Sequence, residues 1–135
     1  TQTPAHTTEY FSELVCSNSL KSNLPDSPAG QLKTEMRALG SIVLQLAEAH
    51  RVPGGAALCV DRNAFGAAIT ATVSAHPNID VIRGPVSADQ CKAWLGQGDT
   101  VLLATGPLTS PDIADWLAAI TGRTNLYFYD AVSPT

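Results

Sequence analysis

The chain has 135 residues, of which 44% are hydrophobic and 15% are charged, and its formal net charge at pH 7 is -4. This composition is typical of one globular domain with a hydrophobic core, and it excludes a disordered segment and a collagen-like repeat. The Lys and Arg residues are scattered, whereas a nucleic-acid-binding surface needs clustered cations. We therefore expect any contact with RNA to lie elsewhere.

Membrane segments and metal sites are not indicated either. No apolar run approaches the roughly 20 residues that cross a bilayer, so we expect no membrane contact and a cytoplasmic location. The three cysteines, Cys16, Cys59 and Cys91, lack the spacing of a zinc site or of a disulfide framework. Free thiols and no metal are expected.

The first part of the chain predicts mainly helix and loop. Residues 8–14 are expected to form a short helix, and a Ser-, Asn- and Pro-rich loop should follow over 16–30. Apolar residues then recur with the 3.6-residue period of one amphipathic helix over 31–51, which Pro53-Gly54-Gly55 ends. We expect residues 1–56 to be a helical insertion that carries a cysteine motif.

Residues 57–135 alternate between strand and helix. Strands are expected at 57–60, 79–83, 100–105 and 126–129. Asp61 should cap one helix, a short helix is expected over 87–95, and Ser110 should start another, for which Gly122 is a suitable C-cap. This alternation predicts an α/β fold with a mostly parallel sheet covered by helices. Ligands bind such sheets at the carboxyl ends of the strands, but the Gly-x-Gly-x-x-Gly motif of a complete dinucleotide site is absent.

Four segments share a specific order and spacing. They are Thr-Pro-Ala-His at 3–6 with Glu-Leu-Val-Cys-Ser-Asn-Ser-Leu at 13–20, Leu-Lys-Thr-Glu-Met-Arg-Ala-Leu at 32–39, Val-Pro-Gly-Gly at 52–55 with Val-Asp-Arg at 60–62, and Ala-Thr-Gly-Pro-Leu-Thr at 104–109 with Leu-Tyr-Phe-Tyr-Asp-Ala at 126–131. Together they resemble the folate- and FAD-dependent tRNA (uracil-5-)-methyltransferases. The resemblance implies that residues 1–135 are part of a Rossmann-like FAD-binding domain.

The resemblance also implies what the parent protein does. It would make 5-methyluridine in the T-loop of tRNA, with methylenetetrahydrofolate as the carbon donor, FAD as the redox group and NAD(P)H as the reductant. In this family the glycine-rich FAD motif precedes the position of Thr1, and the catalytic body with a second cysteine follows Thr135. We therefore expect an internal fragment that is inactive in isolation and meets tRNA only through the parent.

Cys16 is the candidate catalytic residue. Methylation at C5 of uracil normally needs a thiolate that adds to C6, and a cysteine beside small polar side chains suits that step. Taken alone, a free cysteine is more often a buried structural thiol, but the family motif includes this one. The resemblance leaves open whether it attacks uracil or protects a flavin adduct.

The candidate cofactor contacts fall into four groups, and each has a simpler structural alternative. They are Ser17, Asn18 and Ser19; Asp61 and Arg62; Val86; and Thr105 and Gly106. The first group either binds a ligand or caps a turn. The Asp-Arg pair either caps a helix beside an ion-pair partner or supports the flavin. Thr105 and Gly106 either let a dinucleotide approach the backbone closely or form an ordinary turn. Val86 would contact the adenine through its backbone only.

Two other functions stay open. The strand and helix alternation, with Ala-Thr-Gly at 104–106, would also suit a generic FAD-dependent oxidoreductase. A non-catalytic remnant or interaction domain would fold without binding flavin. Replacement of Cys16 in the parent protein separates the methyltransferase from both alternatives.

Overall fold

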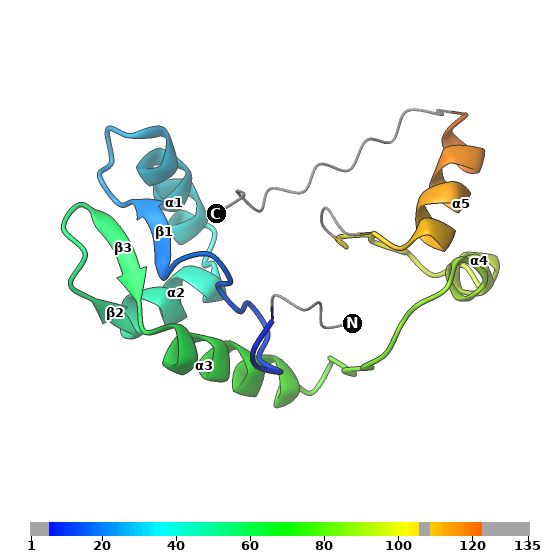
Figure 1. Ribbon diagram of the computed structural model, residues 1–135, viewed down its shortest axis with the longest axis horizontal. Coiled ribbons are helices and arrows are strands. Elements are labelled where there is room, and N and C mark those ends of the chain that lie inside the picture. Colours follow the sequence, from blue (N-terminus) through cyan, green and yellow to red (C-terminus); the bar gives the residue numbers. More distant parts are fainter. Residues whose placement is uncertain (1–5, 106–108, 123–135) are drawn as a thin grey trace. The chain divides into compact units, whose positions relative to one another are not determined.

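The computed structural model describes residues 6–105 and 109–122 (Figure 1). These residues form two compact units that divide between Ile82 and Arg83. The described elements follow the order β1, α1, α2, β2, β3, α3, α4 and α5, which confirms the α/β class. The boundary expected between the helical insertion, 1–56, and the part that alternates strand and helix, 57–135, lies inside the first unit.

The first unit contains a small antiparallel sheet. Its strands β1 (Ser19–Ser22), β2 (Arg51–Val52) and β3 (Ala57–Val60) are arranged in the order β1-β3-β2, and both pairings are antiparallel. The sheet described is therefore not the expected parallel one. The turn between β2 and β3 is too short for the crossover that parallel strands need, so the two strands form a hairpin. Strand β1 was missed because its Ser-Leu-Lys-Ser sequence has weak β propensity.

Two helices replace the single helix predicted over 31–51. Helix α1 (Pro28–Ala38) ends before Gly40, whose φ is 73°, and α2 (Ile42–Ala49) begins after Ser41. The Ser41 side chain accepts a hydrogen bond from the Leu44 N–H at 3.5 Å. The apolar period continues across this break, so periodicity could not reveal it, whereas the Gly-Ser pair is a usual stop and start signal.

Helix α3 (Arg62–Ser74) packs with α2 and β3 around the core of the first unit. Asp61 caps α3 as predicted, since its carboxylate accepts hydrogen bonds from the N–H groups of Asn63 and Ala64 at 3.0 Å each. The buried core residues are Leu44, Ala47, Leu58, Val60, Phe65 and Ile69. This packing holds the turn between β3 and α3 against the core.

Residues 8–14 form turns and bends, so the prediction of a helix there is wrong. Ser12 has a φ of 57°, which does not fit a right-handed helix. The Phe11 N–H donates to the Thr70 hydroxyl of α3 at 2.8 Å. A tertiary partner thus takes a backbone donor that a helix would have used.

Lys33 is a buried cation on α1 and is only 6% exposed. Its Nζ donates to the carbonyl oxygens of Ser22 at 2.9 Å and Ala29 at 3.1 Å, which ties α1 to the end of β1. Burial is the main cause that lowers the pKa of this ammonium, with help from the charges of Arg37 and Lys21. The sequence pattern gave no sign of this burial.

The second unit contains α4 (Ala88–Gly96) and α5 (Pro111–Thr121). The helix expected over 87–95 is present, with Ser87 as its N-cap rather than its first helical residue, and the predicted Gly122 C-cap of α5, with a φ of 65°, is confirmed. The buried residues here are Ala88, Cys91 and Ile113. The Ala88 N–H donates to the Asp112 carboxylate at 2.7 Å, which links the starts of the two helices.

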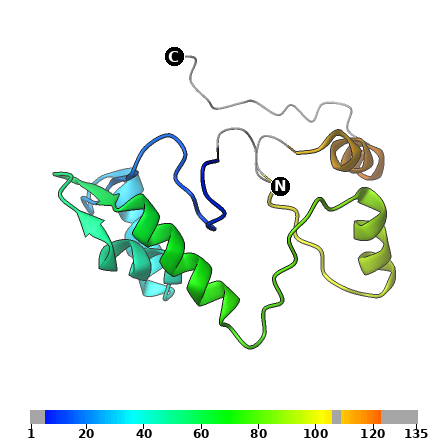
Figure 2. The same cartoon turned by 60° about the horizontal axis from the view of Figure 1, so that its bottom comes forward.

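Two predicted strands are not strands in the described residues. Residues 79–83 and 100–105 lack ladder hydrogen bonds, and Figure 2 draws them without arrows. A strand forms only against a partner that satisfies its backbone groups, and neither segment has such a partner strand within the described part of the chain. The strand expected at 126–129 lies outside the described residues. None of the described helices is long and apolar enough to span a bilayer.

Candidate functional site

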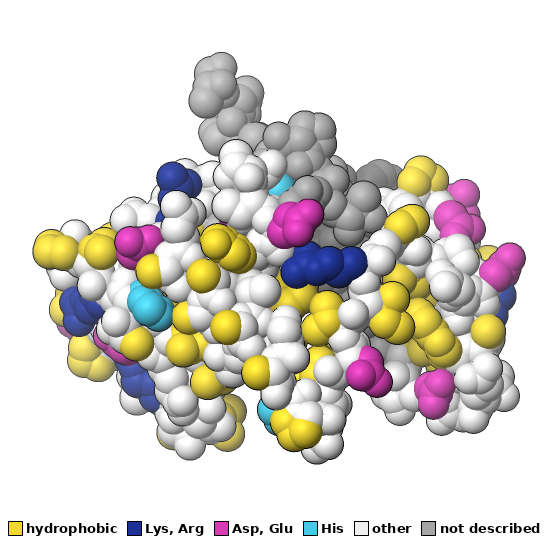
Figure 3. Space-filling view, turned by 90° about the horizontal axis from the view of Figure 1, so that it is seen from below, with side chains coloured by type: hydrophobic (Ala, Val, Ile, Leu, Met, Phe, Trp, Pro, Cys, Tyr) yellow, Lys and Arg dark blue, Asp and Glu magenta, His cyan; other side chains and the backbone are white. Residues whose placement is uncertain are grey.

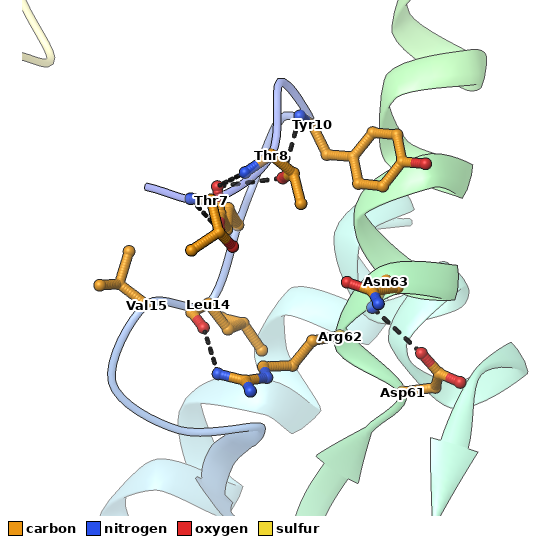
Figure 4. A pocket seen from close by; sticks show the side chains of 9 residues that line it. Thr7, Thr8, Tyr10, Leu14, Val15, Asp61, Arg62 and Asn63 are labelled. Carbon is orange, nitrogen blue, oxygen red and sulfur yellow. Dashed lines mark hydrogen bonds between the residues drawn. The ribbon is translucent and has the colours of Figure 1, made fainter. Parts of the chain in front are cut away.

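Two cavities open beside the turn between β3 and α3, and they share Asp61 and Arg62. The first, which we call the Glu13 cavity, has a volume of about 300 Å³ and is lined by Thr7, Thr8, Tyr10, Glu13, Leu14, Val15, Asp61, Arg62 and Asn63 (Figure 4). The second, the Cys16 cavity, has a volume of about 420 Å³ and is lined by Cys16, Ser17, Asn18, Val52, Val60, Asp61 and Arg62.

The Cys16 cavity brings together five of the residues selected from the sequence. Cys16 is exposed, unlike Cys91, so it is not a buried structural thiol. Ser17 accepts a hydrogen bond from the Ser19 N–H at 3.2 Å through its hydroxyl. The Asn18 carbonyl accepts one from the Val60 N–H at 2.9 Å. Ser17 therefore does cap a turn, and its hydroxyl stays at the cavity wall.

The other selected residues are not among the described residues that line this cavity. Ser19 is the first residue of β1. Val86 and Thr105 belong to the second unit, where Val86 is 43% exposed and the Thr105 hydroxyl lies 2.6 Å from that of Thr109. Gly106 lies outside the described residues. The cofactor roles of these residues stay predictions.

Arg62 connects the two cavities. It is the first residue of α3, and its Nη1 donates to the Leu14 carbonyl oxygen at 3.3 Å (Figure 4). The sequence interpretation paired Asp61 and Arg62 as a helix cap with an ion-pair partner. The cap is present, but the guanidinium bonds to a backbone carbonyl of the segment that leads to Cys16.

Glu13 forms a local cluster that the sequence interpretation missed. One carboxylate oxygen accepts from the Thr7 N–H at 2.9 Å and its hydroxyl at 2.8 Å, and the other accepts from the Thr8 N–H at 3.2 Å and its hydroxyl at 3.0 Å. These bonds, the one from the Thr7 N–H first, lower the pKa of Glu13 to about 2. Adjacent threonines a few residues before a glutamate were the available signal.

The fold and the site together define an α/β domain in which an exposed cysteine loop meets the start of a helix beside a polar cavity. The chain belongs to the glucose inhibited division protein A family, whose model matches residues 1–135. This match agrees with the family resemblance that the sequence motifs indicated.

Named relatives agree with that family. The chain is 49% identical over 132 residues, 98% of its length, to "Methylenetetrahydrofolate--tRNA-(uracil-5-)-methyltransferase TrmFO" of Moorella thermoacetica. Proteins of the same name from Oleidesulfovibrio alaskensis and Staphylococcus carnosus are 49% identical over 131 residues, 97% of the chain, and 47% identical over 133 residues, 98% of the chain. The chain spans 29% of the length of each of these relatives.

Proposed function

We propose that this chain is part of a tRNA (uracil-5-)-methyltransferase that makes 5-methyluridine in the T-loop with methylenetetrahydrofolate, FAD and NAD(P)H. The observation that supports the proposal is the 49% identity over 132 residues to a relative of that name. Because the chain spans 29% of that relative, the activity and the tRNA contact belong to the complete protein. The isolated chain is expected to be inactive, and the complete protein to be cytoplasmic.

Cys16 is the proposed catalytic residue. Uracil C5 is a poor nucleophile, and a thiolate that adds to C6 supplies the electron density that C5 needs to bond to a one-carbon unit. Loss of the C5 proton and expulsion of the thiolate then restore the ring. The exposure of Cys16 at an open polar cavity suits this step. The same position would let the thiol shield a reactive carbon before the uracil arrives.

The donors of the Cys16 cavity fit the polar edge of a flavin. Ser17 and Asn18 line it, and the hydroxyl of the first and the amide of the second can donate to a carbonyl oxygen or ring nitrogen. When bound and reduced by NAD(P)H, the flavin would supply the electrons and relay the carbon unit. Asp61, which caps α3, and Arg62 also line this cavity and would support the flavin from the start of the helix. We assign Ser19, Val86, Thr105 and Gly106 to the remaining cofactor contacts, the last three through their backbone.

A parallel sheet in the complete protein is the finer part of this proposal. Val101 and Leu103 pack against the core of the second unit, whereas Leu102 between them is 87% exposed. A strand that is apolar on both faces is typical of a parallel sheet with helices on either side. Ile82 is likewise 83% exposed, and Figure 3 shows hydrophobic side chains scattered among polar ones at the surface. We therefore propose that 79–83 and 100–105 pair within a Rossmann-like FAD-binding domain.

The test is the Cys16→Ala variant of the complete enzyme. Methyl transfer to a T-loop transcript should fall by about 10⁴-fold or more, the size of effect seen when a covalent nucleophile is removed. Cys59→Ser is the matched control, because Cys59 lies on β3 and does not line the cavity. Bound flavin, read from its absorbance, checks that each variant is assembled. Normal methylation by Cys16→Ala would refute the catalytic role.

A further inference from the structure

The loop that carries Cys16 is anchored on both sides to the turn between β3 and α3. Before the cysteine, the Leu14 carbonyl accepts a hydrogen bond from Arg62 Nη1 at 3.3 Å. After it, the Asn18 carbonyl accepts one from the Val60 N–H at 2.9 Å. The cysteine is therefore held at the tip of a short loop with two fixed ends.

Both anchors rest on rigid structure. Val60 is fully buried, and the Asp61 N–H donates to the His50 carbonyl at 2.9 Å. Arg62 starts a helix that places Phe65, 1% exposed, in the same core. The anchor of Asn18 uses backbone atoms, whereas the anchor of Leu14 uses a side chain. Substitution can therefore remove the Arg62 anchor while the other remains.

We propose that Arg62 is a positioning residue that sets the place of the Cys16 thiol through the Leu14 carbonyl. The inference rests on the proposed function, since it concerns the same cysteine. A misplacement of about 1 Å at a reacting atom can cost about 10²-fold in rate. The guanidinium is suited to the task because its planar donors are held in a fixed geometry at the end of a long stem.

The alternative is that Arg62 binds a ligand directly, since it lines both cavities. The two roles give different kinetics. Loss of a ligand contact raises KM or weakens flavin binding, whereas loss of positioning lowers kcat while KM and flavin content stay unchanged. A lysine at this position keeps a charged donor that can reach a carbonyl, whereas a methionine keeps only the stem.

The kinetic test compares Arg62→Met and Arg62→Lys in the complete enzyme. Arg62→Met should lower kcat by about 10- to 100-fold with unchanged KM for tRNA and unchanged flavin content, and Arg62→Lys should recover part of the loss. Thr70→Val is the matched control, because it removes a different anchor of the same segment, the bond to the Phe11 N–H. It should leave kcat near that of the unaltered enzyme. A raised KM, or a loss of flavin, in both Arg62 variants would overturn the positioning role.

A second readout is independent of methyl transfer. The alkylation rate of Cys16 by iodoacetamide, followed by peptide mass spectrometry, is measured up to the high-pH plateau where every thiol is ionised. Release of the loop should raise the alkylation rate of Cys16 at this plateau roughly threefold or more in Arg62→Met, and by less in Arg62→Lys. An unchanged plateau overturns the proposal, even if Cys16→Ala proves inactive. A raised plateau with an active Cys16→Ala enzyme supports the positioning of the thiol and refutes only its catalytic role.

Discussion

The two units of this chain differ in how fully neighbouring elements bury their apolar side chains. In the first unit, β3 pairs with strands on both sides and its buried face packs on α2 and α3. In the second unit, α4 and α5 bury Ala88, Cys91 and Ile113, but the segment 100–105 forms no ladder with any described residue, and Leu102 is exposed. An apolar pattern marks residues that a complete fold buries, and the burial itself depends on the presence of the covering layer.

Substitution of one core residue should give the largest effect. Phe65→Ala removes a side chain that is 1% exposed in the core of the first unit. The free energy of unfolding should fall by about 3 to 5 kcal/mol, because the lost burial is joined by the cost of a cavity. Urea denaturation of the chain, followed by circular dichroism, measures the change.

The matched control for that experiment lies in the second unit. Leu102→Ala removes an apolar side chain that is 87% exposed, so the stability of the same chain should change by less than about 0.5 kcal/mol. Comparable losses from the two variants would contradict the contrast between the buried core of the first unit and the exposed Leu102 of the second.

Two helical glycines give the next contrast. A Cβ at Gly30 on α1 would collide with the backbone carbonyl of Leu24, whereas a Cβ at Gly96 on α4 would meet nothing within 4 Å. Gly30→Ala should therefore cost about 1 to 3 kcal/mol through overpacking. Gly96→Ala should stabilise the chain by about 0.5 kcal/mol, because alanine is the better helix former.

Thermal melts followed by circular dichroism measure both glycine variants. Because each is a Gly to Ala change inside a helix, intrinsic propensity is matched and only the surroundings differ. A gain in stability from Gly30→Ala would show that the Leu24 backbone can move away from α1 without cost. That result would contradict the close packing of the first unit.

Local signals predicted much of the fold. Asp61 and Gly122 are confirmed as caps, and the strand at 57–60 is confirmed, because caps and short apolar runs depend on neighbouring residues. The antiparallel sheet could not be predicted in this way. Strand β1 depends on its pairing with β3, which lies far along the chain, and the helix expected over 8–14 yields to a bond with Thr70.

The candidate site, like the fold, could be predicted only in part from the sequence, because its contacts join residues that lie far apart in the chain. Family motifs selected Cys16, Asn18 and Arg62, and the structure brings these residues to one cavity. Motifs do not reveal which atoms meet, so the bond from Arg62 to the Leu14 carbonyl had no counterpart in the sequence interpretation. The Glu13 cluster was missed because a charged residue in a polar segment usually faces solvent.

The smallest effect concerns two carboxylates, one in each unit. Glu13 accepts four hydrogen bonds and has a pKa of about 2, whereas the pKa of Asp89 is lowered by its hydrogen bond to Lys92 and by the charge of that residue. Because the folded pKa of Glu13 lies below its ordinary value of 4.5, its contribution to stability is complete above pH 4.5 and is lost as the pH falls towards 2.

Glu13→Gln should remove this acid dependence, because the glutamine amide does not titrate in this pH range. An NMR titration of the Thr7 and Thr8 amides should show a midpoint near pH 2 in the unaltered chain and none in the variant. Glu9→Gln is the control, and it should leave the midpoint in place. Asp89→Asn should alter only the acid response of the second unit. A Thr7 and Thr8 midpoint near 4.5 in the unaltered chain would show that the carboxylate faces water, and that Glu13 does not help Thr70 and Arg62 to hold the segment leading to Cys16.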